Sequence, residues 1–414
     1  MDRTDASPHQ TRLFGPDMLD NPYPVYARLR AATPVLWSEP LKAWIATRFK
    51  DVSTILKDRR LSSDRVSIAR HRYGEKYQPI FDILSRIVLQ TDDPKHAELR
   101  ALIHDAFTRS TIEEYEDGIR GLCRSLLEPG LKRGRMEFHS DFAAPLPILV
   151  ISTIVGVPEE DRAQIKRWCD AFSLAALNFY VHLAEDQLDD CLAEMSAFQA
   201  YLADRIKAAR AAPGPDLLSA LTHAADTRET LDDEDVIANC MLLLNAGNET
   251  TTCLLTNGLY ALLENPSQMT LLRSAPERIP DAIEEFLRLE APAQFLGRIA
   301  TETIEIGGET IGEGDMVLPV IGAANRDPDV FDSPDRLDIT RPHLHQLAFG
   351  TGPHLCAGIH LARFEAKIAF EELLSATSAI DLDTDDLPAG VPAYSPNFNM
   401  RCLSSLPIRL TRSP

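Results

Sequence analysis

The stretch that decides the fold runs Phe349-Gly350-Thr351-Gly352-Pro353-His354-Leu355-Cys356-Ala357-Gly358. Gly350 and Gly352 reach backbone angles that are closed to other residues, so the chain can turn tightly there. Residues 357–375 have the pattern of an amphipathic helix, which would place Cys356 at a helix N-terminus. Unbonded N–H groups and the helix dipole at such an end favour a thiolate over a thiol. The sequence therefore predicts a rigid loop that presents a thiolate as a metal ligand or a nucleophile.

Cys356 has other interpretations when only residue types are considered. It can be a buried cysteine at an ordinary helix entry. A zinc site of His354, Cys356 and His360 would have a spacing unlike that of common structural sites, with no second cysteine pair. A cysteine protease would need a partner histidine and an orienting amide, which nothing in the sequence singles out. A phosphate-binding loop is excluded because no Gly-Lys-Ser/Thr follows. Residue types alone therefore allow either a structural or a chemical role for Cys356.

The same stretch matches the pattern Phe-Gly-x-Gly-x-His-x-Cys-x-Gly, which resembles the haem-binding signature of soluble bacterial cytochromes P450. This resemblance implies heme b, an iron protoporphyrin IX, with Cys356 as its metal ligand through an axial thiolate. It also implies that His354 bonds a haem propionate and that Phe349 and Gly350 belong to the cofactor site. The implied fold is mainly α with a small β portion. The haem would lie between the long central helix and the cysteine-loop helix.

A long helix with a polar interruption is predicted over Asp232–Leu263, about 48 Å at about 1.5 Å per residue. Its apolar middle changes abruptly into Asn245–Thr252, where a buried acid and hydroxyls are costly unless they are bonded or used. By itself, this stripe can also face solvent or another polar helix. The run Ala-Gly-x-Glu-Thr-Thr within it resembles the oxygen-activation segment of the same family. The resemblance implies Glu249 and Thr250 as the catalytic acid–alcohol pair, with Ala246 beside the haem.

Glu285 and Arg288 share one face of a further predicted helix at i, i+3. By spacing alone, such a pair is most often an ordinary surface pair. Its place between the polar helix and the Gly-rich strands resembles the Glu-x-x-Arg pair of the family. The resemblance implies a structural role, in which the pair holds the irregular segment that supports the cysteine loop. We expect Arg336 to be the third member of this group, with Arg341 as the second choice.

Three more basic residues are expected at the cofactor. His96 and Arg100 lie at i, i+4, which by itself describes an ordinary solvated helix face. The resemblance implies that both bind haem propionates, and it gives the same role to Arg298. A dianionic porphyrin can be buried only where cationic or hydrogen-bonding groups receive its charge.

Composition excludes several classes of function. The chain has 414 residues, and 42 basic against 62 acidic residues give a formal charge of −20. Such a chain repels phosphate, so we expect no nucleic acid partner. Its longest aliphatic stretches, such as Leu146–Val155, are far shorter than the roughly 20 residues of a spanning helix, so we expect no membrane insertion. Its seven cysteines form no paired framework, which indicates a reducing compartment. Met1–Gln10 contains no apolar run typical of a signal peptide, and we expect a cytoplasmic protein.

We expect a single cytochrome P450 domain over residues 1–414. Alternating apolar residues predict a two-stranded hairpin in a β-rich part at about 33–49, and short apolar runs between Gly-rich turns predict a second β-rich part at about 299–320. Apolar residues at three- and four-residue spacing predict a helical part over about 94–290. The haem-binding loop would occupy 349–358.

The expected function is that of a haem-thiolate monooxygenase. It would insert one atom of dioxygen into a small-to-medium, largely apolar organic substrate by hydroxylation or epoxidation. The chain has no flavin or iron–sulfur motif, so electrons from NAD(P)H would come through a separate ferredoxin- or flavodoxin-type partner, with Arg363 and Lys367 as candidate contacts. Two alternatives stay open. One is an enzyme of the same fold that catalyses oxidative coupling, desaturation or a peroxide-driven reaction, and the other is a non-catalytic haem-binding carrier or sensor.

Overall fold

The structure is a computed structural model that describes residues 16–104, 107, 109–177, 179–180, 182–342, 345–387 and 390–414. The expectation for Met1–Gln10 lies outside the described residues. The chain divides into two compact units. Unit 1 comprises Met1–Leu61, Tyr115–Leu146 and Thr250–Pro414, and unit 2 comprises Ser62–Glu114 and Pro147–Glu249. The single domain over residues 1–414 stays a prediction.

The strands that the structure describes form three sheets, in the orders β1-β2-β8-β5-β3, β4-β10-β9 and β6-β7. Their bounds are β1 (Val35–Ser38), β2 (Ala43–Ala46), β3 (Leu61–Ser62), β4 (Arg135–Glu137), β5 (Arg298–Ala300), β6 (Ile304–Ile306), β7 (Glu309–Ile311), β8 (Met316–Pro319), β9 (Thr377–Leu382) and β10 (Pro407–Arg412). β1 and β2 pair antiparallel, with Val35 opposite Ala46. β2 runs parallel to β8, with Ala43 opposite Met316. Strands that are distant in sequence therefore meet in one sheet, which the hairpin pattern alone does not indicate.

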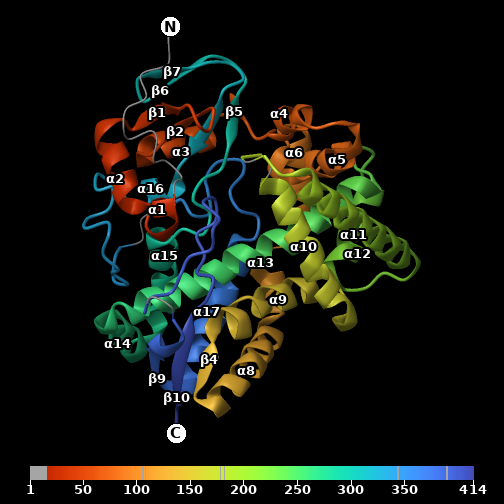
Figure 1. Cartoon of the computed structure of the whole chain (residues 1–414). Helices are drawn as coiled ribbons and strands as arrows, with labels where there is room; N and C mark the ends of the chain where they lie inside the picture. The colour runs from red at the N-terminus through yellow and green to blue at the C-terminus, as the bar shows by residue number, and fades with distance from the viewer. Residues whose placement is uncertain are drawn as a thin grey trace. The chain divides into compact units, whose positions relative to one another are not determined.

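Helices surround these sheets within unit 1. They are α1 (Pro16–Asp20), α2 (Tyr23–Ala32), α3 (Phe49–Lys57), α8 (Glu116–Arg133), the π-helix η6 (His139–Ala143), α14 (Pro266–Ser274), η8 (Pro276–Arg278), α15 (Ile279–Leu289), α16 (Ile321–Ala324), α17 (Ile359–Ala376) and η9 (Thr384–Asp386). Figure 1 shows α3 beside β1 and β2. Val52 and Ile55 of α3 are fully buried there in one cluster with Val35 and Trp44 of the strands. This burial of apolar area on one helix face holds α3 against the sheet.

Unit 2 is helical, apart from the strand residue Ser62. Its helices are α4 (Val66–Ala69), η2 (Arg70–Arg72), η3 (Glu75–Tyr77), α5 (Gln78–Ser85), η4 (Val88–Gln90), α6 (Lys95–His104), α7 (Arg109–Glu113), α9 (Pro145–Val155), η7 (Glu159–Asp161), α10 (Arg162–Leu177), α11 (Glu185–Ala211) and α12 (Leu217–Asp226). α11 packs against both α10 and α12 (Figure 1). Trp168 of α10 stacks on Phe198 of α11 with 5.1 Å between the ring centroids. The mainly α fold with a small β portion is confirmed.

α13 (Asp233–Leu263) is a continuous helix of 31 residues, and its first part belongs to unit 2 and its last part to unit 1. The predicted first residue, Asp232, caps it instead: its Oδ1 accepts from the backbone N–H of Asp235 at 2.9 Å. Within the described residues, neither α13 nor another helix combines the length and the apolar character that a membrane crossing requires.

A buried carboxyl group lies in the packing of α17 against α8. Glu365 of α17 is 2% exposed, and its Oε1 has no hydrogen-bond partner among the described residues. Burial raises the pKa of Glu365 from 4.5 to about 8, because the charged form loses its hydration. Around neutral pH the carboxyl group is therefore mostly protonated in the folded protein.

Replacing Glu365 by glutamine is expected to flatten the dependence of stability on pH. Because the pKa of Glu365 is higher in the folded than in the unfolded protein, this residue leaves the free energy of unfolding unchanged below about pH 4.5. Between about pH 4.5 and about pH 8 it lowers the free energy of unfolding as the pH rises. Within this window the loss is about 1.4 kcal/mol per pH unit. Urea unfolding at several pH values should show the Glu365→Gln variant gaining on the parent protein as pH rises. Glu313→Gln, at an exposed turn, is the control; equal slopes in all three proteins would contradict the assignment.

Candidate functional site

The cysteine loop is closed by its own backbone. Gly350 and Gly352 have φ of 71° and 76°, as predicted for a tight turn that needs glycine. The N–H of Cys356 donates to the carbonyl of Phe349 at 2.9 Å, and that of Gly350 donates to Leu347 at 2.8 Å. A Cβ on Gly352 would lie 2.7 Å from the carbonyl oxygen of Leu56, at the end of α3. Gly352 is therefore required both by its backbone angles and by this close approach.

Cys356 differs from every other cysteine of the chain in its exposure. It is partly exposed, whereas the other six are buried. Helix α17 begins at Ile359 with Gly358 as its N-cap, two residues later than predicted, so the prediction that Cys356 stands at the helix N-terminus is wrong. The physical reason is that the N–H of Cys356 is already bonded within the loop. The loop itself, rather than the first helical turn, fixes the direction of the thiol.

Arg363 ties this loop to α15, although its side chain stays partly exposed. Its Nε and Nη2 donate to the Glu284 carboxylate at 2.6 and 2.9 Å, and its guanidinium lies 4.9 Å from the ring centroid of Phe349. Gln346 donates to the same carboxylate at 3.2 Å. Lys367 forms an ion pair with Glu371 at 3.4 Å. Both predicted contacts for an electron donor thus have acidic partners within the chain.

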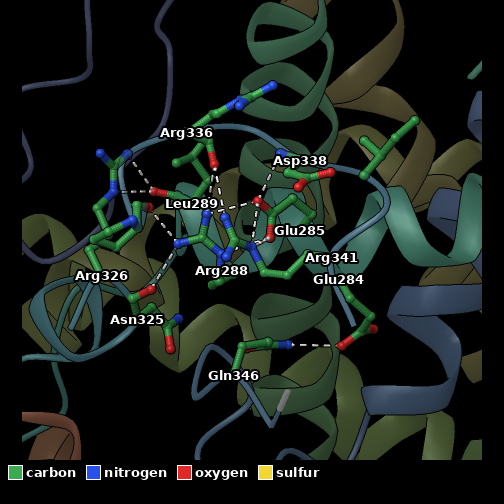
Figure 2. Close-up of polar contacts among 12 residues, drawn as sticks. Glu284, Glu285, Arg288, Leu289, Asn325, Arg326, Arg336, Asp338, Arg341 and Gln346 are labelled. Atoms are coloured by element: carbon green, nitrogen blue, oxygen red, sulfur yellow. Dashed lines mark hydrogen bonds and ion pairs between the residues drawn. The ribbon is translucent and has the colours of Figure 1, made fainter. Parts of the chain in front are cut away.

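The Glu-x-x-Arg pair is buried and not a surface pair. Figure 2 shows its polar contacts. Arg288 donates to both carboxylate oxygens of Glu285, at 2.7 and 2.8 Å. Its remaining N–H groups donate to the backbone carbonyls of Asn325, Pro334 and Arg336. The pair therefore holds the backbone of the irregular segment directly, through carbonyl groups that no helix or strand satisfies.

Arg341 is the third charged member of this group. Its Nε donates to both oxygens of Glu285 at 3.2 Å (Figure 2). The expectation that Arg336 takes this place is wrong: its side chain is exposed, and only its carbonyl joins the network. In an irregular segment no periodicity tells which side chain turns inward, so the sequence could not separate the two arginines.

The polar stretch of α13 contains an open turn in the middle of the helix. The neighbouring residues Met241–Leu244 are buried, whereas Ala246 is exposed, and Asn245, Glu249 and Thr250 are partly exposed. In unit 2, the amide oxygen of Asn245 accepts from Ser173 Oγ of α10 at 2.9 Å. Sequence reasoning did not find Ser173, because nothing in a sequence relates it to a residue so far along the chain.

Thr252, two residues after Thr250 on α13, has a structural role. Its Oγ1 donates to the carbonyl of Ala143 in η6 at 3.1 Å. Thr252 is thus buried and bonded within unit 1, whereas Thr250 is the partly exposed threonine of the polar stretch.

The basic residues expected at a cofactor lie in both units, and each is described within its own. In unit 2, His96 is 4% exposed on α6, and its Nδ1 lies 3.5 Å from the Asp93 carboxylate. Burial lowers the pKa of His96, although Asp93 opposes the shift. Arg100 follows on the next turn of α6 and is partly exposed. In unit 1, Arg298 begins β5 and is 2% exposed, and His354 is partly exposed in the cysteine loop.

The comparisons with known proteins decide the family. The family model for cytochrome P450 matches residues 61–386. The chain belongs to the cytochrome P450 family. The biotin biosynthesis cytochrome P450 of Bacillus subtilis (strain 168) is 37% identical over 394 residues, which is 95% of this chain and 97% of that protein. The cytochrome P450 monooxygenase PikC of Streptomyces venezuelae is 36% identical over 423 residues, 99% and 96% of the two chains.

A solved structure extends this similarity to three dimensions. The crystal structure of P450BioI, in complex with an acyl carrier protein ligated to hexadec-9Z-enoic acid, matches this P450 with a TM-score of 0.87 at 36% identity. The match covers 95% of this chain and 99% of that one. The protein is a P450 monooxygenase, and the cofactor of its family is haem with an axial cysteine thiolate.

The residues present fit such a cofactor. An axial thiolate needs a cysteine that is open to the haem and held in one direction, and the glycine-built loop offers Cys356 in that way. A buried porphyrin needs donors for its carboxylates; Arg298 of unit 1 is a buried basic side chain, and so, within unit 2, is His96. Ala246, on the unit 2 part of α13, is an exposed residue with a small side chain.

Arg341→Ala is expected to lower the free energy of unfolding of this P450 by about 2–3 kcal/mol, because it removes a partner from a nearly buried carboxylate. Arg336→Ala removes an exposed side chain but keeps the carbonyl, and should change stability by less than about 0.5 kcal/mol. Urea unfolding of the two variants measures the difference. Equal losses would mean that Arg341 does not support Glu285.

Proposed function

We propose that this P450 binds heme b through Cys356 and inserts one atom of dioxygen into a largely apolar organic substrate. The observation that carries this assignment is the setting of Cys356. It is a partly exposed thiol on a loop with two left-handed glycines, in a chain whose other cysteines are buried. A ligand held in this way approaches a metal from one fixed direction without a reorganisation cost. Phe349, under the guanidinium of Arg363, and Gly350 keep the loop in this form.

In this proposal His96, Arg100, Arg298 and His354 hold the haem propionates. Burial lowers the pKa of His96, so around neutral pH it acts as a neutral hydrogen-bond donor. Arg298 and Arg100 keep their charge and offset the charge of the carboxylates. The rigid strand β5 sets the position of Arg298, whose Nη1 also donates to the carbonyl of Gly297 at 2.9 Å. A group fixed on a strand holds a cofactor carboxylate in one orientation.

Glu249 and Thr250 deliver protons in the proposed reaction. Haem, when bound, supplies the chemistry that activates dioxygen with two electrons. The chain must bring protons to that place and keep bulk water away from it. Thr250 can donate from Oγ1 and regain its proton through the Glu249 carboxylate, which is partly exposed and exchanges with solvent. Ala246 has the small side chain that leaves room for dioxygen.

The proposed substrate is apolar with few polar groups. The turn of α13 that precedes the open stretch carries buried leucines, and Asn245 follows it. Because Ser173 holds the amide oxygen of Asn245, the amide nitrogen is left to donate to an oxygen of the substrate. The likeness to P450BioI, solved with a fatty acyl chain on its carrier protein, favours an acyl chain within this class. The electrons come from NAD(P)H through a ferredoxin- or flavodoxin-type donor.

The carbon monoxide spectrum of the reduced holoprotein tests the assignment of Cys356. We expect the red-shifted Soret band of thiolate-ligated haem, and its loss in Cys356→Ala and Cys356→His. Cys240→Ala, at a buried cysteine, is the matched control and should keep the band. An unchanged spectrum in the Cys356 variants would remove this residue from the role, and a haem-free or imidazole-ligated protein would reject the proposal as a whole.

Thr250→Ala is expected to separate oxygen consumption from product formation. Without the hydroxyl, proton delivery slows, and more of the reduced oxygen leaves as peroxide. Oxygen uptake, peroxide and product are measured together once a substrate is found by ligand-induced spin-state shifts. Product per oxygen should fall by about tenfold, and Thr250→Ser, which keeps a hydroxyl, should restore most of it. Tight coupling in Thr250→Ala would reject the proton-delivery role.

A further inference from the structure

Two buried cysteines from distant parts of the chain meet inside unit 1. Cys253 lies on α13 and is fully buried, and Cys402 lies in the segment before β10 and is 5% exposed. Thr256 Oγ1, on the next turn of α13, lies 3.9 Å from Cys402 Sγ. Asn257 Nδ2 donates to the carbonyl of Arg401 at 2.8 Å. These contacts hold the Cys402 segment against the helix face that carries Cys253.

His139 of η6 completes this group. The bond from Thr252 to the carbonyl of Ala143 joins η6 to the same part of α13. The hydrogen bond with Cys253, the bond and charge of His139 and the contact with Thr256 together lower the pKa of Cys402 to about 6, against the effect of burial. These neighbours favour the thiolate form of Cys402 near neutral pH, and one of them is the thiol of Cys253.

The pKa values of the other buried cysteines shift in the opposite direction to that of Cys402. Burial raises the pKa of Cys191 to about 11 and those of Cys169 and Cys240 to about 12. Burial also raises the pKa of Cys123. A buried cysteine without donors stays a thiol and is inert. Cys402 has the reactive form because three side chains donate to it.

We propose that Cys253 and Cys402 form a redox-active dithiol, which hydroperoxides convert into an intramolecular disulfide. Neither residue belongs to the proposed haem site, and the site for this modification is the group of Cys253, Cys402, His139 and Thr256. The chemistry needs only a two-electron oxidant that is small enough to reach a nearly buried sulfur, and hydrogen peroxide meets this requirement.

The reaction proceeds in two balanced steps. The Cys402 thiolate attacks one oxygen of hydrogen peroxide, the O–O bond breaks, and hydroxide leaves and takes a proton, giving a sulfenic acid and water. The Cys253 thiol then attacks the Cys402 sulfur, and a second water leaves as the S–S bond forms. Two thiols thereby lose two electrons and two protons, and one peroxide becomes two waters.

The disulfide would join α13 to the C-terminal segment. Cys253 lies about one helical turn after Thr250, so the new bond would constrain the turn that carries the proposed proton donor. This consequence for turnover rests on the proposed function, whereas the disulfide itself does not. The experiment therefore measures the bond and not the activity.

The test is disulfide mapping of the reduced holoprotein after treatment with hydrogen peroxide. After alkylation and digestion, mass spectrometry should detect a peptide pair that joins Cys253 to Cys402, and dithiothreitol should release it. This test uses only the parent protein, so it does not depend on whether a variant folds. The proposal would be overturned if both cysteines were recovered as alkylated thiols. It would also be overturned if Cys402 stayed a sulfenic acid that formed no bond to Cys253.

Variants separate the roles within the group. Cys253→Ser and Cys402→Ser should each abolish the linked peptide, and Cys191→Ser, at a buried cysteine whose pKa is raised, should leave it unchanged. His139→Asn should slow disulfide formation by about tenfold near neutral pH, because it removes a group that favours the thiolate. An unaltered rate in His139→Asn would show that Cys402 is not activated in this way and would overturn the mechanism. The carbon monoxide spectrum, which depends on Cys356, is read separately on each variant.

Discussion

The carboxylate of Glu285 is the group on which the irregular part of unit 1 depends. It accepts from Arg288, from Arg341 and from the backbone N–H of Asp338 at 3.0 Å. Burying a carboxylate and a guanidinium costs several kcal/mol per ion unless each donor and acceptor is satisfied. Here the guanidinium of Arg288 also donates to carbonyls of the irregular segment. The ion pair thus satisfies backbone carbonyls of this segment, as the hydrogen bonds between strands do in a sheet.

This constraint extends to the cysteine loop through short links. Asn325, whose carbonyl accepts from Arg288, accepts through its own side chain from the N–H of Leu347 at 2.7 Å. Leu347 in turn accepts from Gly350 at the start of the loop. On the other side, Glu284 holds Arg363 of α17, and Arg363 covers Phe349. Neighbouring carboxylates of one helix, Glu284 and Glu285, therefore anchor the loop and the segment that leads to it.

The sequence predicted the elements of the fold better than the partners of individual side chains. Local patterns predicted α13 to within one residue, and β1 and β2 lie where alternation indicated a hairpin. The parallel pairing of β2 with β8 and the choice of Arg341 over Arg336 were not predictable, because both depend on how distant segments meet. The family was readable from the cysteine loop, since a closed loop with left-handed glycines requires particular residues at fixed spacing.

Burial acts on the cysteines of this P450 in opposite ways, and the difference lies in what else is near the sulfur. Desolvation alone raises the pKa of a thiol, as at Cys240. The Cys402 sulfur is nearly as buried, yet donors from Cys253, His139 and Thr256 reverse the shift. At Cys356 the loop leaves the sulfur partly open, so that a metal can approach it. Exposure and hydrogen-bond donors are thus separate routes to a reactive sulfur, and this chain uses one at the haem loop and the other in the core of unit 1.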